Sequence, residues 1–115
     1  MIPRLSPPFD ASDALAMIGG SLRPGGAAAF EAAAVSALGI THALAFSMGR
    51  SGLYALINVM GWRNRDIIVP AYTCAVVADA IVASGNRPRF VDVGLSDYNM
   101  KPEHIARTIS GDTVA

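Results

Sequence analysis

Apolar and polar residues are distributed along the chain in a way that predicts short buried strands separated by helices. Three short apolar runs are predicted to be strands, and the first is uninterrupted, as is typical of a strand that is buried on both faces. They are residues 41–47, 66–70 and 88–93. Helical segments separate these runs and no hairpin turn joins any two of them. The predicted fold class is therefore α/β, with a mostly parallel sheet.

The spacing of apolar residues between these runs predicts the helices. Apolar side chains recur at helical intervals in residues 27–38, 53–60 and 75–84, and a proline suited to a first helical turn opens a last helix at residue 102. A glycine follows each of the first three segments, where a helix C-cap is expected: Gly39, Gly61 and Gly85. Residues 113–115 resemble the first residues of a fourth strand.

The N-terminal segment has a different character. The first fifteen residues contain three prolines, and residues 19–26 contain four glycines. We expect residues 1–26 to be an extended lead-in with a Gly-rich loop, and residues 27–115 to be the folded domain. Because three strands with three helices cannot cover both faces of a parallel sheet, we expect this domain to be the incomplete N-terminal portion of a larger α/β protein.

Composition excludes several classes of function. The formal net charge is zero, which gives no electrostatic basis for binding nucleic acid or an anionic membrane. One cysteine and two histidines are too few for a disulfide framework or a closed metal site. The first ten residues lack the apolar core that a signal peptide needs, and no apolar run is long enough for a membrane span, so a cytoplasmic location is expected. Hydrophobic residues reach 52% and charged residues only 16%, which indicates apolar surface that another element covers.

A turn of small residues follows the first apolar run and opens a helix. It consists of Gly49, Arg50 and Ser51. Unpaired N–H groups at a helix start bind phosphate, and a glycine lets an anion approach the backbone closely. Arg50 and Ser51 add a positive charge and a hydroxyl. The same residues also fit an ordinary strand-to-helix turn, whereas the spacing excludes a Walker loop and a dinucleotide-binding fingerprint.

A second group of candidate side chains follows the next apolar run. Tyr72 and Cys74 come directly after Pro70, where a strand gives way to a helix. The carboxyl ends of parallel strands form the ligand crevice of an α/β sheet, so we expect both residues on the same rim as Arg50 and Ser51. Tyr72 can stack on a flat ring. Cys74 is either a small buried hydrophobic residue or a thiol that lines the site, and no histidine is placed to activate it.

Three segments, in this order and at this spacing, resemble the start of the pyridoxal-phosphate-dependent sugar aminotransferases of the DegT/DnrJ/StrS kind. They read ALAFSMGRSGLYALINVMG, DIIVPAYTC and NRPRFVDVGLSDYNMKPEHIARTISGDT. The family pattern has a serine-glycine-threonine or serine-glycine-arginine turn before an apolar helix, then VIVPxxT, and then PVFVDVD with an asparagine-containing loop. The resemblance extends from about Phe30 to the end of the sequence.

The resemblance implies the large domain of a fold-type-I transferase that uses pyridoxal 5'-phosphate as cofactor and forms a homodimer. Gly49, Arg50 and Ser51 would hold the cofactor phosphate, with Arg50 in place of the more usual threonine. Cys74 matches a position where an aromatic residue often stacks on the pyridine ring, and Tyr72 is the nearby aromatic residue. The implied reaction moves an amino group from an amino acid, typically glutamate, to a keto-sugar nucleotide.

No catalytic residue and no metal ligand are assigned from the sequence. In the family, the lysine that forms a Schiff base and the acid that pairs with the pyridinium come from sequence downstream of the matched segments. The one lysine here, Lys101, lies in the loop before the last predicted helix and is not proposed for that role. The chain is therefore expected to be an inactive fragment when alone. The alternatives are a short non-catalytic chain that docks on a partner protein and a fragment of a pyridoxal-phosphate-dependent sugar dehydratase.

Overall fold

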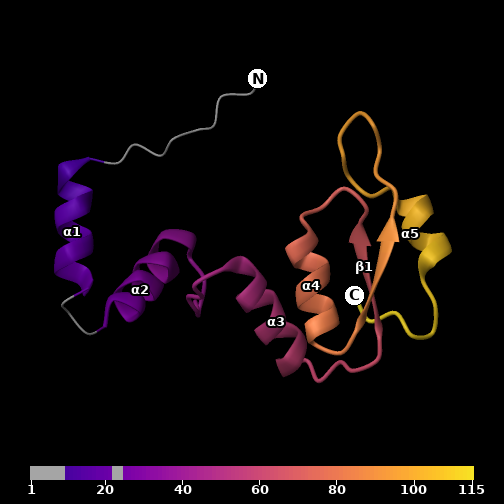
Figure 1. Cartoon of the computed structure of the whole chain (residues 1–115), viewed down its shortest axis with the longest axis horizontal. Helices are drawn as coiled ribbons and strands as arrows, with labels where there is room; N and C mark the ends of the chain where they lie inside the picture. The colour runs from indigo at the N-terminus through magenta and orange to yellow at the C-terminus, as the bar shows by residue number, and fades with distance from the viewer. Residues whose placement is uncertain (1–9, 22–24) are drawn as a thin grey trace. The chain divides into compact units, whose positions relative to one another are not determined.

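The computed structural model describes residues 10–21 and 25–115. These residues contain five helices and two strands, joined by turns and irregular segments (Figure 1). The chain divides into two units, Met1–Ala45 and Phe46–Ala115. The first unit contains helices only, and the second contains the sheet. The α/β class with a parallel sheet, predicted from the apolar runs, is confirmed in the second unit.

Helix α1 (Ala11–Ser21) begins at a capping box formed by Asp10 and Asp13. Asp10 Oδ1 accepts hydrogen bonds from the backbone amides of Ser12 at 2.8 Å and Asp13 at 3.0 Å, while Asp13 Oδ2 accepts the amide of Asp10 at 3.0 Å. The expectation of an extended lead-in is therefore wrong for residues 11–21, because these capping bonds nucleate a helix. The rest of that lead-in and loop, residues 1–9 and 22–24, lies outside the described residues.

Helix α2 (Gly26–Leu38) ends as the sequence predicts, at Gly39 in the left-handed conformation with φ 64°. The strand expected at residues 41–47 is wrong, since these residues form irregular chain. The amide of Ala45 donates to Glu31 Oε1 at 2.7 Å instead of to a neighbouring strand, and Leu44 is 79% exposed. An apolar run becomes a buried strand only where a partner strand satisfies its backbone groups.

Strands β1 (Asp66–Pro70) and β2 (Arg87–Val91) pair in parallel, with Asp66 opposite Arg87 and Pro70 opposite Val91. The last three residues run parallel to β1 on its other side, as expected for the beginning of a further strand. The amide of Val114 donates to Asp66 O at 3.0 Å, and the amide of Ile68 donates to Ala115 O at 2.7 Å. Strand β1 therefore has hydrogen-bonded neighbours on both sides.

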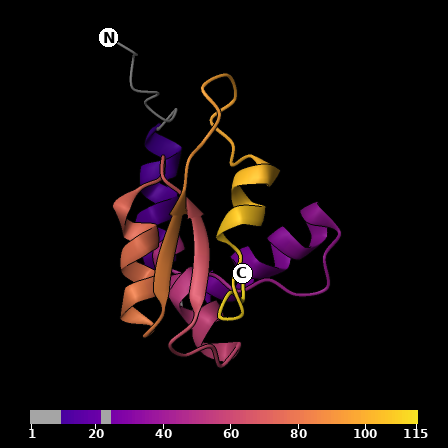
Figure 2. The ribbon, with the colours of Figure 1, turned by 90° about the vertical axis from the view of Figure 1, so that its right-hand side faces the viewer.

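Helices α3 (Gly49–Val59), α4 (Ala75–Ala83) and α5 (Pro102–Thr108) complete the second unit, and α4 and α5 lie on opposite sides of the strands (Figures 1 and 2). The alternation along β1 fits this arrangement. Ile67 and Val69 join Ile57 of α3 and Ile81 of α4 in the buried core. Ile68 points the other way, into a cavity of about 400 Å³ that it shares with Ile105 and Ile109.

Two polar groups hold the amino ends of the strands in place. Asn86 is buried, and its Nδ2 donates to the carbonyl of Trp62 at 2.9 Å and to Ser84 O at 3.2 Å, while its Oδ1 accepts the amide of Arg65 at 3.0 Å. Asp66 is also buried and pairs with Arg87 at 2.7 Å. These contacts fix the turn between α4 and β2 against the segment that leads into β1.

Candidate functional site

The first turn of α3 presents the three residues that the sequence singled out as a phosphate site. Met48 precedes the helix in an extended conformation, and its carbonyl accepts the amides of Ser51 at 3.0 Å and Gly52 at 3.3 Å. Within the described chain, no side chain caps this turn. The ordinary alternative of a serine N-cap is therefore not what the structure has, because Ser51 lies inside the first turn and Met48 holds the N-cap position.

Two glycines in this turn serve different purposes. A Cβ on Gly49 would meet no atom within 4 Å, so the space in front of its backbone is open. A Cβ on Gly52 would lie 3.2 Å from Cδ2 of Phe46, so a side chain there would displace the phenyl ring. Gly52 thus permits the packing of the turn, and Gly49 leaves room for an anion to approach.

Arg50 and Ser51 line a cavity of about 280 Å³ between α3 and α4. Tyr54 adds an aromatic wall from α3, and α4 contributes Asp79, Ala80 and Ala83. The guanidinium and the hydroxyl suit a phosphate, whereas the Asp79 carboxylate repels an anion and attracts the arginine. The donors of this cavity therefore belong to its α3 side.

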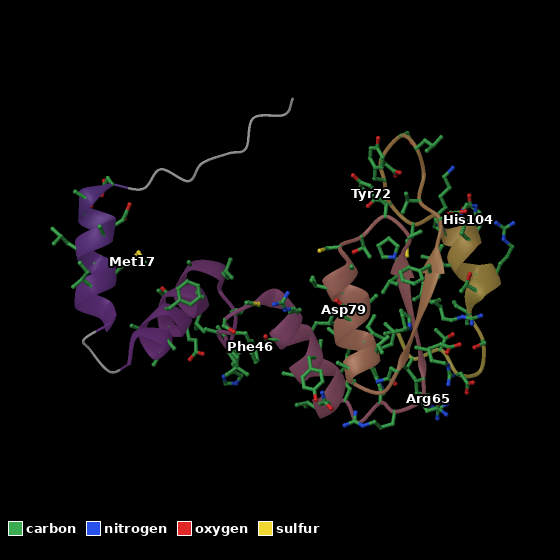
Figure 3. All side chains as sticks on the ribbon, viewed as in Figure 1. Met17, Phe46, Arg65, Tyr72, Asp79 and His104 are labelled. Atoms are coloured by element: carbon green, nitrogen blue, oxygen red, sulfur yellow. The ribbon has the colours of Figure 1, made fainter. Side chains whose placement is uncertain are left out.

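Tyr72 and Cys74 lie at the carboxyl end of β1, as predicted. Figure 3 shows Tyr72 at the end of the strands opposite to that of Arg65. Cys74 is a free, exposed thiol directly before α4, so the interpretation of this residue as a buried hydrophobic side chain is wrong. The whole segment from the end of β1 to the first residue of α4, residues 71–75, is solvent-exposed, so no other element of the described chain covers Cys74.

The structure does not bring the four candidate side chains Arg50, Ser51, Tyr72 and Cys74 together in one cavity. Arg50 and Ser51 share a cavity to which neither Tyr72 nor Cys74 contributes. Tyr72 instead contacts Tyr98, with ring centroids 5.3 Å apart and ring planes tilted by 37°.

Asp79 and Tyr98 are the side chains that sequence reasoning missed. Asp79 is the one charged residue of α4, and Tyr98 lies in the polar loop after β2, where ligand-binding side chains of a parallel sheet gather. The charge of Asp79 and the loop position of Tyr98 can both be seen in the sequence, but neither predicts which residues these side chains contact.

Residues 10–21 and 25–115 contain neither a membrane-spanning helix nor a cluster of metal-ligating side chains. No helix in these residues is long and apolar enough to cross a bilayer. No group of three or more histidine, cysteine, aspartate or glutamate side chains in them is arranged to hold a metal ion. His104, on α5, has Nδ1 at 3.4 Å from the carbonyl of Asp92.

A sequence profile of the DegT/DnrJ/EryC1/StrS aminotransferase family matches residues 16–115. Protein MosB of Rhizobium meliloti is 32% identical over 88 residues, which are 76% of this chain and 17% of that protein. The 3-amino-5-hydroxybenzoate synthase of Amycolatopsis mediterranei (strain S699) is 34% identical over 76 residues, which are 65% of this chain and 20% of that protein. The chain thus spans about a fifth of the length of these relatives.

Solved structures have the same fold over most of the chain. An aminotransferase from Psychrobacter cryohalolentis superposes with a TM-score of 0.81 at 23% identity, covering 93% of this chain and 29% of that one. DesV of S. venezuelae gives a TM-score of 0.76 at 23% identity, covering 89% and 29%. The aminotransferase TlmJ of Streptoalloteichus hindustanus gives 0.53 at 28% identity, covering 57% and 18%.

Proposed function

The chain belongs to the DegT/DnrJ/EryC1/StrS aminotransferase family. We propose that it is part of a pyridoxal-phosphate-dependent aminotransferase that acts on a keto-sugar nucleotide. The amino donor is an amino acid, typically glutamate. In this proposal residues 27–115 belong to the cofactor-binding large domain, and the protein is a cytoplasmic homodimer that makes amino sugars. The observation that carries the proposal is the open first turn of α3, where Arg50 and Ser51 face one cavity.

The donors at this turn fit the phosphate of the cofactor. Arg50 offers a permanent positive charge, Ser51 offers a hydroxyl, and the backbone at Gly49 is open to an approaching anion. A phosphate dianion needs several donors on one side, and all of these come from one helical turn. The Asp79 carboxylate lies on the opposite wall of the cavity, on α4, away from these donors.

Tyr72 and Cys74 are the residues that we propose at the carboxyl edge of the sheet, beside the cofactor. When bound, pyridoxal 5'-phosphate supplies an aldehyde and an electron-accepting ring for amino transfer. This chain contributes binding and orientation: Arg50 and Ser51 anchor the phosphate, and the side chains after β1 limit the positions that a flat ring can take. The exposed thiol of Cys74 offers less stacking area than an aromatic side chain would.

A cofactor titration tests the proposal directly. The double variant Arg50→Ala with Ser51→Ala removes a charged and a neutral donor, so its affinity for pyridoxal 5'-phosphate should fall by about tenfold or more. Binding is followed by the absorbance of the cofactor. The matched control is Arg107→Ala with Ser36→Ala, which removes one arginine and one serine from exposed positions on α5 and α2. Equal affinity of the two double variants would remove the α3 turn from the cofactor site.

A further inference from the structure

We propose that Tyr72 and Tyr98 form a stacking site for the nucleobase of a nucleotide-activated substrate. The inference rests on the proposed function, since it assigns to this aromatic pair one part of the substrate named there. Tyr98 has no part in the cofactor site described above. Tyr72 also flanks the proposed cofactor, so the pair is a neighbouring binding element at the same edge of the sheet and shares Tyr72 with the cofactor site.

Both rings remain largely open to solvent although they contact each other. Tyr72 is 71% exposed and Tyr98 is 59% exposed. They come from the two loops that follow β1 and β2, and these loops meet where parallel strands place their ligands. Each ring supports the other across their contact at 5.3 Å and leaves its outer face free. Such a surface suits a flat ring, because base–aromatic stacking needs only exposed faces.

The loop that carries Tyr98 is built to hold the ring in position. Tyr98 has a φ of 57°, a left-handed conformation that is uncommon for a large side chain. Hydrogen bonds from Tyr98 N to Gly94 O and from Gly94 N to Asn99 O, each 2.9 Å, close the loop around this conformation. Backbone strain of this kind persists only where the surrounding structure fixes it. The loop thus orients Tyr98 before any ligand arrives.

The loop that carries Tyr98 also holds a cation, Lys101, and an anion, Asp97. A Cβ on Gly94 would lie 3.0 Å from Cε of Lys101 and 2.8 Å from Oδ1 of Asp97, so the lysine stem packs across the loop. The Asp97 carboxylate accepts the amide of Asn99 at 3.2 Å, an Asx-type bond that engages this anion within the loop. Lys101 is the cation of the loop that carries Tyr98, and the phosphates of a nucleoside diphosphate whose base stacks on the pair would be attracted to it.

Two planar rings meet in the proposed reaction, the nucleobase and the pyridine ring of the cofactor. The cavity that Arg50 and Ser51 line does not include Tyr72 or Tyr98. The aromatic pair is therefore separate from the proposed phosphate anchor, and its exposed rings leave room for a second flat ring such as the nucleobase.

The experiment measures the affinity of the full chain for uridine diphosphate and for pyridoxal 5'-phosphate separately, by calorimetry. Tyr72→Leu and Tyr98→Asn should each weaken uridine diphosphate binding about 5- to 100-fold. Asparagine suits the left-handed backbone at position 98, so that variant removes the ring without adding strain. Tyr72→Phe and Tyr98→Phe keep the rings and should retain most of the affinity. Phe30→Leu, which shortens an exposed aromatic residue on α2, should leave it unchanged.

Each outcome either supports or overturns the assignment. Loss of uridine diphosphate affinity in the two ring-deleting variants, with rescue by phenylalanine and an unchanged thermal unfolding midpoint, supports it. Loss of pyridoxal 5'-phosphate affinity alone would assign the pair to the cofactor and overturn the nucleobase. Cofactor binding by a chain that does not bind uridine diphosphate would overturn this inference and leave the proposed function standing. Ring-dependent nucleotide binding without cofactor binding would support the stacking site and contradict the proposed cofactor.

Discussion

At the scale of one residue, the buried side chain of Asn86 stabilises the second unit through hydrogen bonds. It is buried and bridges the end of α4 to the residues before β1 through both its amide nitrogen and its oxygen. Asn86→Ala would leave the carbonyl of Trp62 and the amide of Arg65 without this partner. The free energy of unfolding should fall by about 1–3 kcal/mol, measured by urea denaturation followed by circular dichroism. Asn99→Ala, at an exposed position, should change it by less than about 0.5 kcal/mol.

Asp10 makes the start of α1 sensitive to pH. A hydrogen bond from the Ser12 hydroxyl, together with the backbone amides of Asp13 and Ser12, lowers the pKa of the Asp10 carboxyl below its usual value of 3.8. A lowered pKa means that the charged carboxylate is the capping form. The cap is therefore complete above the usual value and is lost as the pH falls through the lowered pKa. The amides of Ser12 and Asp13 should exchange faster below that point in an NMR titration, and Asp10→Asn should abolish the dependence.

The candidate site residues could be predicted from the sequence as positions, but their contacts could not. Residues after a buried strand lie at the carboxyl edge of a sheet, which is why Tyr72 was found. Its partner Tyr98 lies 26 positions further along, and only the closed loop from Gly94 to Asn99 brings the two rings together. The first turn of α3 was found because small residues precede an apolar helix, although no strand comes before it, since residues 41–47 form irregular chain.

At the scale of elements, the local sequence pattern predicted a helix or strand correctly where the element packs against neighbours in its own unit. β1 was predicted at its observed bounds, and α4 and α5 were found through their helical spacing. Residues 41–47 were predicted as a strand from their apolar run alone, and a strand needs a neighbour that the run itself does not specify. Helix α1 was not predicted, because the prolines before Asp10 indicated an extended segment and the capping box of Asp10 and Asp13 begins only after them.

Two aspartates pair with the same arginine, Arg87, but differ in burial, so the contribution of burial to the strength of an ion pair can be measured. Asp66 accepts Arg87 Nε at 2.7 Å and its side chain is 9% exposed, whereas Asp112 accepts Arg87 Nη2 at 3.3 Å and is 60% exposed. Asp66→Asn should therefore lower the free energy of unfolding by about 1–3 kcal/mol. Asp112→Asn should lower it by less than about 1 kcal/mol, and by still less in high salt. Equal effects in urea denaturation would show that burial does not decide the strength of this network.

At the scale of the whole molecule, the high apolar content reappears as exposed apolar side chains. In the first unit the described helices expose large residues at more than 60% of their surface: Leu15, Met17, Ile18, Phe30 and Leu38. No side chain of α2 is buried. The second unit has a core of Ile57, Ile67, Val69 and Ile81. The two units therefore differ in what stabilises them, since helices of this length are marginal in water without burial of one face.

Hydrogen exchange should divide the chain at this boundary. Amides of α1 and α2 should exchange within about tenfold of the unstructured rate, because few apolar contacts oppose their opening. Amides of β1 and α4 should exchange about a hundredfold or more slowly, because they open only with the core around Ile57 and Ile81. Mass spectrometry of peptides from one sample measures both groups, so the second unit is the internal control. Strong protection of α2 that does not vary with protein concentration would contradict this division. Protection that rises with concentration would instead mean that a second copy of the chain covers the exposed face containing Phe30.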